Sequence, residues 1–317
     1  MTDTSQLLVA TDFSARSERA LSRALELAQG GRLTVLHVMK PELPDDLAQV
    51  WRKAAQAYLD KRLGDLAASG SADVEGVVVA RDAFGAIIGE AARRRAGLIV
   101  IGAPAWRGYA VMFVGTTAER VIRFSNIPVL MVRREAAGPY LRILSAFDGS
   151  DGSVRALKAA VAIAPKAEFR IVHAWRPPQA SAGDAETARS AIQRENESLK
   201  PLIHKAATDA LSPAGGNLVI DMIEDNPLVA MRNQTGSADL LVLGTHSKGR
   251  LATTLSIGSL ARHLFGRSSL RCSGFPSLGF GRTAAGKPRV RCMARSGPRA
   301  STSGIRRCAS SSCGAGW

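Results

Sequence analysis

The chain has 317 residues, of which 46% are hydrophobic and 22% charged, a length and composition typical of a globular protein with two domains. Its apolar runs, such as residues 98–102, are far shorter than the roughly 20 residues that a membrane-spanning helix needs. The first twelve residues lack the basic segment of a secretory signal. These features argue against a membrane-spanning or fibrous protein, and we expect a cytoplasmic location and no membrane partner.

The formal net charge of +15 is distributed unevenly along the chain. Residues 264–317 contain ten lysines and arginines and no acidic residue, which leaves a charge of +5 on residues 1–263. All four cysteines also lie in this C-terminal part, at positions 272, 292, 308 and 313. The rest of the chain is therefore only mildly basic and predicts no disulfide framework.

The first part of the chain is repeated in the second. LLVATDFSARSERAL, which begins at Leu7, recurs as ILSAFDGSDGSVRAL from Ile143, and each copy combines an apolar strand, an aspartate, a serine-containing turn and a helix. The equivalent residues Asp12 and Asp148 are 136 positions apart, and the matching glycines 102 and 244 are 142 apart. We infer a duplication of a unit of about 140 residues.

Short apolar runs alternate with longer helical patterns in both copies, which is typical of βαβ units and a parallel sheet. In the first copy we expect strands at 7–12, 32–38, 73–79, 98–102 and 128–132, and helices at 15–29, 44–68, 83–96 and 115–125. The second copy follows the same order to residue 263, where its last helix breaks off and its final strand is missing. The predicted fold is α/β, with two tandem, open, Rossmann-like parallel-sheet sandwiches and helices on both faces.

A glycine-containing loop follows the fourth strand of the first copy. Gly102, Ala105, Gly115 and Thr116 have the spacing Gly-x2-Ala-x9-Gly-Thr. Glycine lets a phosphate approach the backbone, and a helix that begins at Gly-Thr offers free N–H groups and a hydroxyl to an anion. Because parallel sheets bind ligands at the carboxyl ends of their strands, this loop predicts an anion site there.

These residues resemble the universal stress protein family, whose nucleotide-binding members carry Gly-x2-Gly-x9-Gly-(Ser/Thr). The resemblance covers residues 4–133 and 140–263, including the aspartate after the first strand and the Arg-Asp or Glu-Asp turn before the third helix. It implies a five-stranded parallel sheet of the adenine nucleotide alpha hydrolase-like kind and frequent dimerisation through the last strand. It also implies ATP binding, with accompanying Mg²⁺, in a subset of members, and no settled catalytic reaction.

Carried over residue by residue, the resemblance implies a candidate nucleotide site in each copy. The residues of the two sites are Asp12, Val38, Gly102, Ala105, Gly115, Thr116 and Thr117 in the first, and Asp148, Ala174, Gly244, Ser247, Gly258 and Ser259 in the second. Both copies depart from the family pattern. Ala105 and Ser247 stand where the middle glycine belongs, and ten residues rather than nine separate Ser247 from Gly258.

Two of these candidates, and the histidines, also have structural interpretations. Asp12 and Asp148 could cap the helix that follows them, contact a ligand, or do both. The five histidines lack the spacing of a metal site, and we expect a structural role for His37 and His173, which are equivalent residues of separate copies.

We place the first domain at residues 4–134 and the second at residues 139–265. A tail follows at 266–317. The tail is rich in Gly, Ser and Arg and has no apolar periodicity, so we do not expect it to fold. Our hypothesis is that residues from about 264 arise from a shift of reading frame. The alternative is a genuine basic tail that binds nucleic acid.

The function expected from these patterns is that of a cytoplasmic stress-response protein which binds ATP or a related nucleotide. It would act through self-association, pairing of its two domains or partner contacts, and not as an enzyme, since no catalytic arrangement is evident. Any ATP hydrolysis would be slow and incidental. A nucleotide-independent interaction module and a nucleic-acid binder that uses the basic tail are the alternatives.

Overall fold

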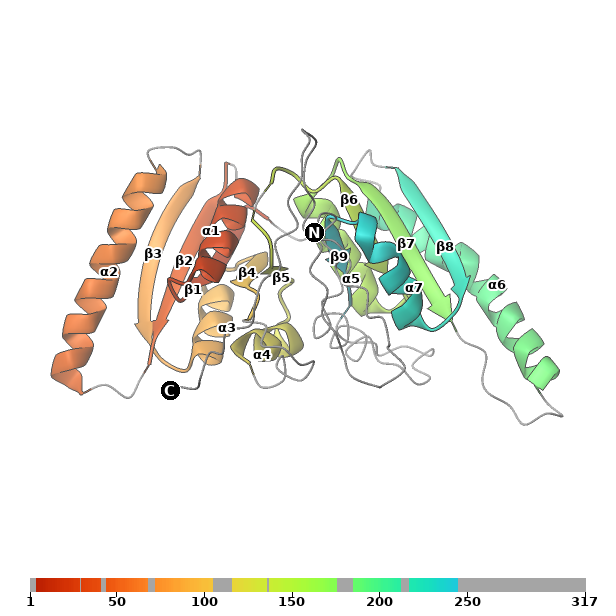
Figure 1. Cartoon of the computed structure of the whole chain (residues 1–317), viewed down its shortest axis with the longest axis horizontal. Coiled ribbons are helices and arrows are strands. Elements are labelled where there is room, and N and C mark those ends of the chain that lie inside the picture. The colour runs from red at the N-terminus through yellow and green to blue at the C-terminus, as the bar shows by residue number, and fades with distance from the viewer. Residues whose placement is uncertain are drawn as a thin grey trace, which may run out of the picture. The chain divides into compact units, whose positions relative to one another are not determined.

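The computed structural model describes residues 4–28, 30–40, 44–67, 72–104, 116–135, 137–175, 185–211 and 217–244 (Figure 1). Both sheets lie within residues 1–270. The predicted tail at 266–317 and the predicted loss of a final strand fall outside the described residues.

The first sheet has five parallel strands in the order β3-β2-β1-β4-β5. Its strands are β1 (Gln6–Thr11), β2 (Arg32–Met39), β3 (Asp73–Ala80), β4 (Leu98–Gly102) and β5 (Val129–Val132). Each begins and ends within one residue of its prediction. In the middle of the sheet, Val9 of β1 lies between Val35 of β2 and Val100 of β4.

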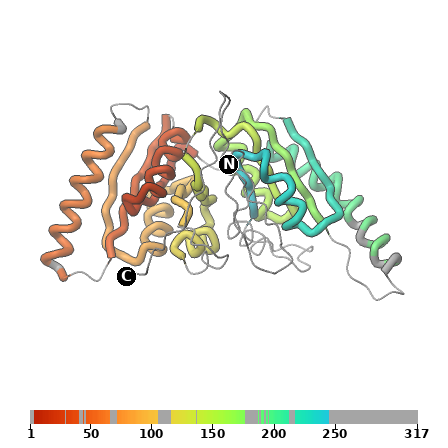
Figure 2. Tube along the Cα trace, viewed as in Figure 1, coloured from red at the N-terminus to blue at the C-terminus, as the bar shows by residue number. Residues whose placement is uncertain are grey.

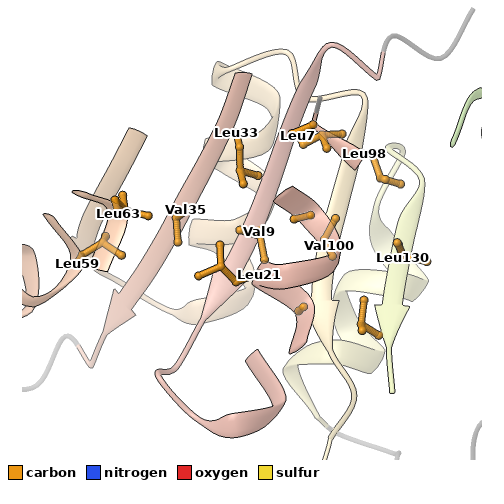
Figure 3. Packing of buried hydrophobic residues seen from close by; sticks show 14 residues of the cluster. Leu7, Val9, Leu21, Leu33, Val35, Leu59, Leu63, Leu98, Val100 and Leu130 are labelled. Carbon is orange, nitrogen blue, oxygen red and sulfur yellow. The ribbon is translucent and has the colours of Figure 1, made fainter. Parts of the chain in front are cut away.

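Four helices cover this sheet: α1 (Ala15–Leu27), α2 (Asp45–Ala67), α3 (Ala83–Arg93) and α4 (Thr117–Phe124). Leucines and valines alternate between the two faces of the strands, so each face forms its own core. Leu7, Val9 and Val35 pack with Leu21 of α1 and Leu59 of α2 on one face (Figure 3). A second core, on the other face, contains residues of α3 and α4.

The second sheet repeats the plan with four described parallel strands in the order β8-β7-β6-β9. The strands are β6 (Arg142–Ala146), β7 (Glu168–Trp175), β8 (Leu218–Glu224) and β9 (Leu240–Val242). The helices are α5 (Asp151–Ile163), α6 (Ala185–Leu211) and α7 (Pro227–Gln234), with a short 3₁₀ helix at Thr235–Ser237. One core packs α5 and α6 on the sheet and another packs α7. The alternation of strand and helix can be followed along the Cα trace (Figure 2).

The predicted α/β class with tandem parallel sheets is therefore confirmed. In the part of the chain that the structure describes, no helix is long and apolar enough to cross a membrane.

Candidate functional site

A tight turn connects β1 to α1 and carries the first candidate residue, Asp12. Its Oδ1 accepts a hydrogen bond from the Ser14 N–H at 3.0 Å, and the Ser14 hydroxyl in turn accepts from the Ser17 N–H at 3.4 Å. Burial alone would raise the pKa of Asp12, but hydrogen bonds from Ser14 and Ser17 and the charge of Arg16 lower it below its ordinary value. Asp12 is thus held as a carboxylate at the carboxyl end of a parallel strand.

The second copy has the same turn. Asp148 Oδ1 accepts from the N–H of Ser150 at 3.0 Å and from its hydroxyl at 2.6 Å. Ser150 is the N-cap of α5, as Ser14 is the N-cap of α1. The serine two positions later, and not the aspartate, caps each helix, so each aspartate fixes the turn that positions the cap.

The middle residue of the turn differs between the copies. Phe13 has a φ of 60° and Gly149 a φ of 74°, so both lie in the left-handed region that favours glycine. The Phe13 ring stacks on His37 with centroids 4.1 Å apart and meets Tyr58 of α2 edge-on at 4.8 Å. These aromatic contacts offset the strained backbone of Phe13.

The two equivalent histidines link the first two strands of each sheet. His37 Nδ1 is 3.0 Å from the carbonyl oxygen of Thr11, and His173 Nδ1 is 2.9 Å from that of Phe147. A carbonyl only accepts, so each Nδ1 carries the proton and donates. This geometry agrees with the structural role expected for both residues.

Gly102 ends β4, and Gly244 lies two residues after the end of β9; each packs against the first turn of the first helix of its copy. A Cβ at Gly102 would lie 2.8 Å from the Arg16 carbonyl oxygen, and one at Gly244 would lie 2.7 Å from the Ser153 nitrogen. Both glycines are therefore required by close packing of backbone on backbone. The sequence suggested an approach to phosphate for these residues and gave no indication of this contact.

Thr116 and Thr117 begin α4. The Thr116 hydroxyl accepts from the Glu119 N–H at 3.1 Å and makes Thr116 the N-cap, whereas Thr117 is the first helical residue. Val38 pairs with Val79 in the first sheet and Ala174 with Ile223 in the second, and both side chains are half-buried. Five predicted site residues lie outside the described ranges: Ala105, Gly115, Ser247, Gly258 and Ser259.

An acidic residue and an arginine that were not predicted as site residues connect α3 to α4. Asp82 caps α3 by accepting from the Gly85 N–H at 2.8 Å, and its other oxygen is 3.4 Å from Arg120 Nη1. The Arg120 guanidinium also lies over the Phe84 ring, 4.5 Å from its centre. The Arg-Asp turn noted in the sequence therefore orients α4, which begins at Thr117.

This arrangement gives the carboxyl edge of the first sheet two complementary groups. Asp12 supplies an ionised carboxylate, which accepts hydrogen bonds from hydroxyl groups, and the start of α4 supplies N–H groups and a positive dipole end, which favour an anion. No group of three or more His, Cys, Asp or Glu able to hold a metal occurs within the described ranges. The edge is thus suited to a ligand with both hydroxyl and phosphate groups.

Comparison with known proteins identifies the class. The sequence pattern of the universal stress protein family matches residues 4–133 and 139–270. The two matches span most of the chain, and each contains one of the two sheets with its helices. The chain therefore belongs to the universal stress protein family and carries two of its domains.

Two solved structures that match most of the chain show the same fold. A universal stress protein from Archaeoglobus fulgidus DSM 4304 is 19% identical, with a TM-score of 0.56, and the match covers 84% of this chain and 97% of that one. A putative universal stress protein from Pseudomonas aeruginosa UCBPP-PA14 is 17% identical, with a TM-score of 0.50 and coverage of 84% and 90%. A universal stress protein in complex with cAMP is 26% identical, with a TM-score of 0.35 and coverage of 40% and 96%. Among curated proteins, no sequence matches this chain.

Proposed function

We propose that the first domain binds ATP or a related adenine nucleotide at the carboxyl edge of its sheet. The observation that carries the proposal is that Asp12, Gly102 and Thr116, three positions of the family's nucleotide motif, occupy the ends of β1 and β4 and the start of α4. In open parallel sheets, this is the edge at which ligands bind.

The chemistry of the edge fits the two halves of a nucleotide. The carboxylate of Asp12 would accept from ribose hydroxyls, and the start of α4 would face phosphate. Val38, half-buried near the end of β2, would border the base. Mg²⁺, if present, would accompany the nucleotide and be held by its phosphates together with few protein ligands.

We assign this binding to the first domain because its motif keeps the family spacing. In the second domain, ten residues separate Ser247 from Gly258, where the family has nine. An extra residue would displace the following helix from the phosphates.

The biological role that we propose is that of a cytoplasmic stress-response protein that acts through self-association, domain pairing or partner contacts. We propose no enzymatic turnover beyond incidental hydrolysis of ATP. The alternative is a nucleotide-independent interaction module, which would show no response to ATP. A nucleic-acid binder would instead lose affinity steeply with salt and depend on residues 266–317.

Calorimetric titration with ATP tests the proposal in the wild type and in Thr116→Asp. Aspartate is a good N-cap, so it keeps α4 capped while it places a negative charge where the phosphates would bind. The matched control is Asn226→Asp, which adds the same charge at the N-cap of α7 in the second domain.

We expect ATP to bind the wild type and Asn226→Asp with similar affinity, and Thr116→Asp at least about tenfold more weakly, since like charges repel across a short distance. Equal heats in all three proteins, or none in any, would reject the proposed site. Substituting Gly102 or Gly244 would not serve, because a side chain at either position collides with backbone.

A further inference from the structure

A cavity of about 460 Å³ lies away from the candidate nucleotide site. Its walls come from the end of β5, the connection that leads into β6, and the segment from α7 to β9. Five arginines line it, and only two acidic residues do: Arg23, Arg133, Arg134, Arg142 and Arg232 are opposed by Glu135 and Asp239. The lining therefore has an excess of three positive charges.

Two of the five arginines have partners. Arg23 Nη1 donates to Glu26 Oε2 and to the Gly138 carbonyl, each at 2.7 Å, and its guanidinium lies 4.3 Å from the centre of the Tyr140 ring. Arg142 Nη2 donates to Asp239 Oδ1 at 2.9 Å. These contacts hold the two arginines in place in the cavity wall. Asp239 is already paired with Arg142 and does not neutralise the other arginines.

The other three arginines, Arg133, Arg134 and Arg232, form no ion pair with any residue in the described ranges. The Nε of Arg232 is buried and has no hydrogen-bond partner there. A buried donor without a partner costs on the order of 1–3 kcal/mol, so the Nε of Arg232 gains from an acceptor placed in the cavity.

Arg133 is half-buried, and its burial disfavours the charged form of the guanidinium. Loss of solvent, and then the charge of neighbouring Arg134, lower the pKa of Arg133 below its ordinary value. The two cations repel each other, and an anion between them would remove the repulsion and replace the lost water.

We propose that this cavity binds a small, multiply charged oxyanion, which carries phosphate or carboxylate groups and is held by Arg133, Arg134 and Arg232. Guanidinium groups match such oxyanions because their paired N–H groups donate to two oxygens at once. The chain's own C-terminal residues do not complement the cavity, since residues 264–317 contain no acid. The proposal does not depend on the nucleotide site.

Calorimetry on the full chain with inorganic pyrophosphate and, separately, with citrate tests it and distinguishes the two anion types. Arg133→Gln and Arg232→Gln each remove one cation and keep a polar side chain. The matched control is Arg52→Gln, which makes the same change on the exposed surface of α2. Thr116→Asp shows whether the anion binds in this cavity or at the start of α4, because it places a negative charge only at the latter.

We expect at least one of the two anions to bind the wild type, Arg52→Gln and Thr116→Asp alike, and to bind Arg133→Gln and Arg232→Gln about tenfold more weakly. Binding to the wild type should weaken as salt is raised. Without anion, both cavity variants should unfold at the same or a higher temperature than the wild type, because each lacks an unpaired cation. No binding of either anion, unchanged binding in the cavity variants, or loss of binding in Thr116→Asp alone would overturn the proposal.

Discussion

Gly102 packs directly on the backbone of Arg16, with the position of a Cβ only 2.8 Å from the Arg16 carbonyl oxygen. We predict that Gly102→Ala lowers the free energy of unfolding by about 1–3 kcal/mol, because the strand and helix must move apart. The control is Gly89→Ala on α3, where an added Cβ has no other atom within 4 Å. This substitution should stabilise the helix by about 0.5–1 kcal/mol, because alanine loses less backbone entropy than glycine. Chemical denaturation measures the free energy of unfolding of both variants. Equal stability of Gly102→Ala and Gly89→Ala would contradict a packing role for Gly102.

Phe13 combines a left-handed backbone with a stacked ring, and two substitutions separate these effects. Phe13→Ala loses the contacts with His37 and Tyr58 but keeps the strained φ of 60°, whereas Phe13→Gly loses the contacts and relieves the strain. We expect both to be less stable than the wild type, with Phe13→Gly the more stable of the two by about 1 kcal/mol. The reverse order in thermal or urea unfolding would show that the backbone is unstrained.

The lowered pKa of Asp12 predicts a pH dependence of stability. The pKa of Asp12 is lower in the folded than in the unfolded state, where it is about 3.9. The ionised carboxylate therefore stabilises the fold at pH values above about 3.9, and this stabilisation is lost as the pH falls through the pKa of the folded state. Asp12→Asn keeps the turn but removes the charge, so wild type should exceed it in stability at neutral pH and approach it on acidification. Asp209→Asn, on the exposed surface of α6, controls for the charge change. A constant difference between Asp12→Asn and wild type from pH 7 to 3 would refute the assignment.

Arg94, at the end of α3, connects two strands and a helix. Its guanidinium contacts Glu75 of β3, Glu90 of α3 at 3.3 Å and Thr34 of β2 at 3.3 Å, and its side chain is only 15% exposed. Arg94→Met should therefore cost about 1–3 kcal/mol. The Arg93 side chain is 61% exposed and, within the described ranges, forms its ion pair with Glu90, so Arg93→Met should cost less than about 1 kcal/mol. Unfolding experiments that rank these two variants the other way would contradict the role of Arg94.

Much of the fold was predictable from the sequence because its strands are continuous apolar runs bounded by polar turns. Leu98–Gly102 was predicted to the residue, and the duplicated Asp-x-Ser turn marked the start of both first helices. Helix ends were less accurate: α3 ends at Arg93, three residues before the predicted end. The helical pattern continues there, but Arg95 adopts a φ of 54° and ends the helix, which periodicity does not reveal.

The sequence predicted which end of the sheet the motif residues lie at, and the structure has Asp12 and Thr116 at that carboxyl edge. The role of each residue could not be predicted in the same way, because a glycine required by packing and a glycine required by a ligand look the same in a sequence. Gly102 could be assigned to packing only once Arg16 was placed beside it. The arginine-lined cavity could not be predicted from the sequence, because Arg133 and Arg232 are 99 positions apart in the chain and only the fold brings both to its lining.

Equilibrium dialysis with labelled ATP tests the central claim, nucleotide binding by the first domain, most directly. We predict one ATP bound per wild-type chain at saturation, one per chain for Asn226→Asp, and strongly reduced binding for Thr116→Asp at the same ATP concentration. No bound ATP in the wild type, or the same amount bound by Thr116→Asp, would contradict the claim.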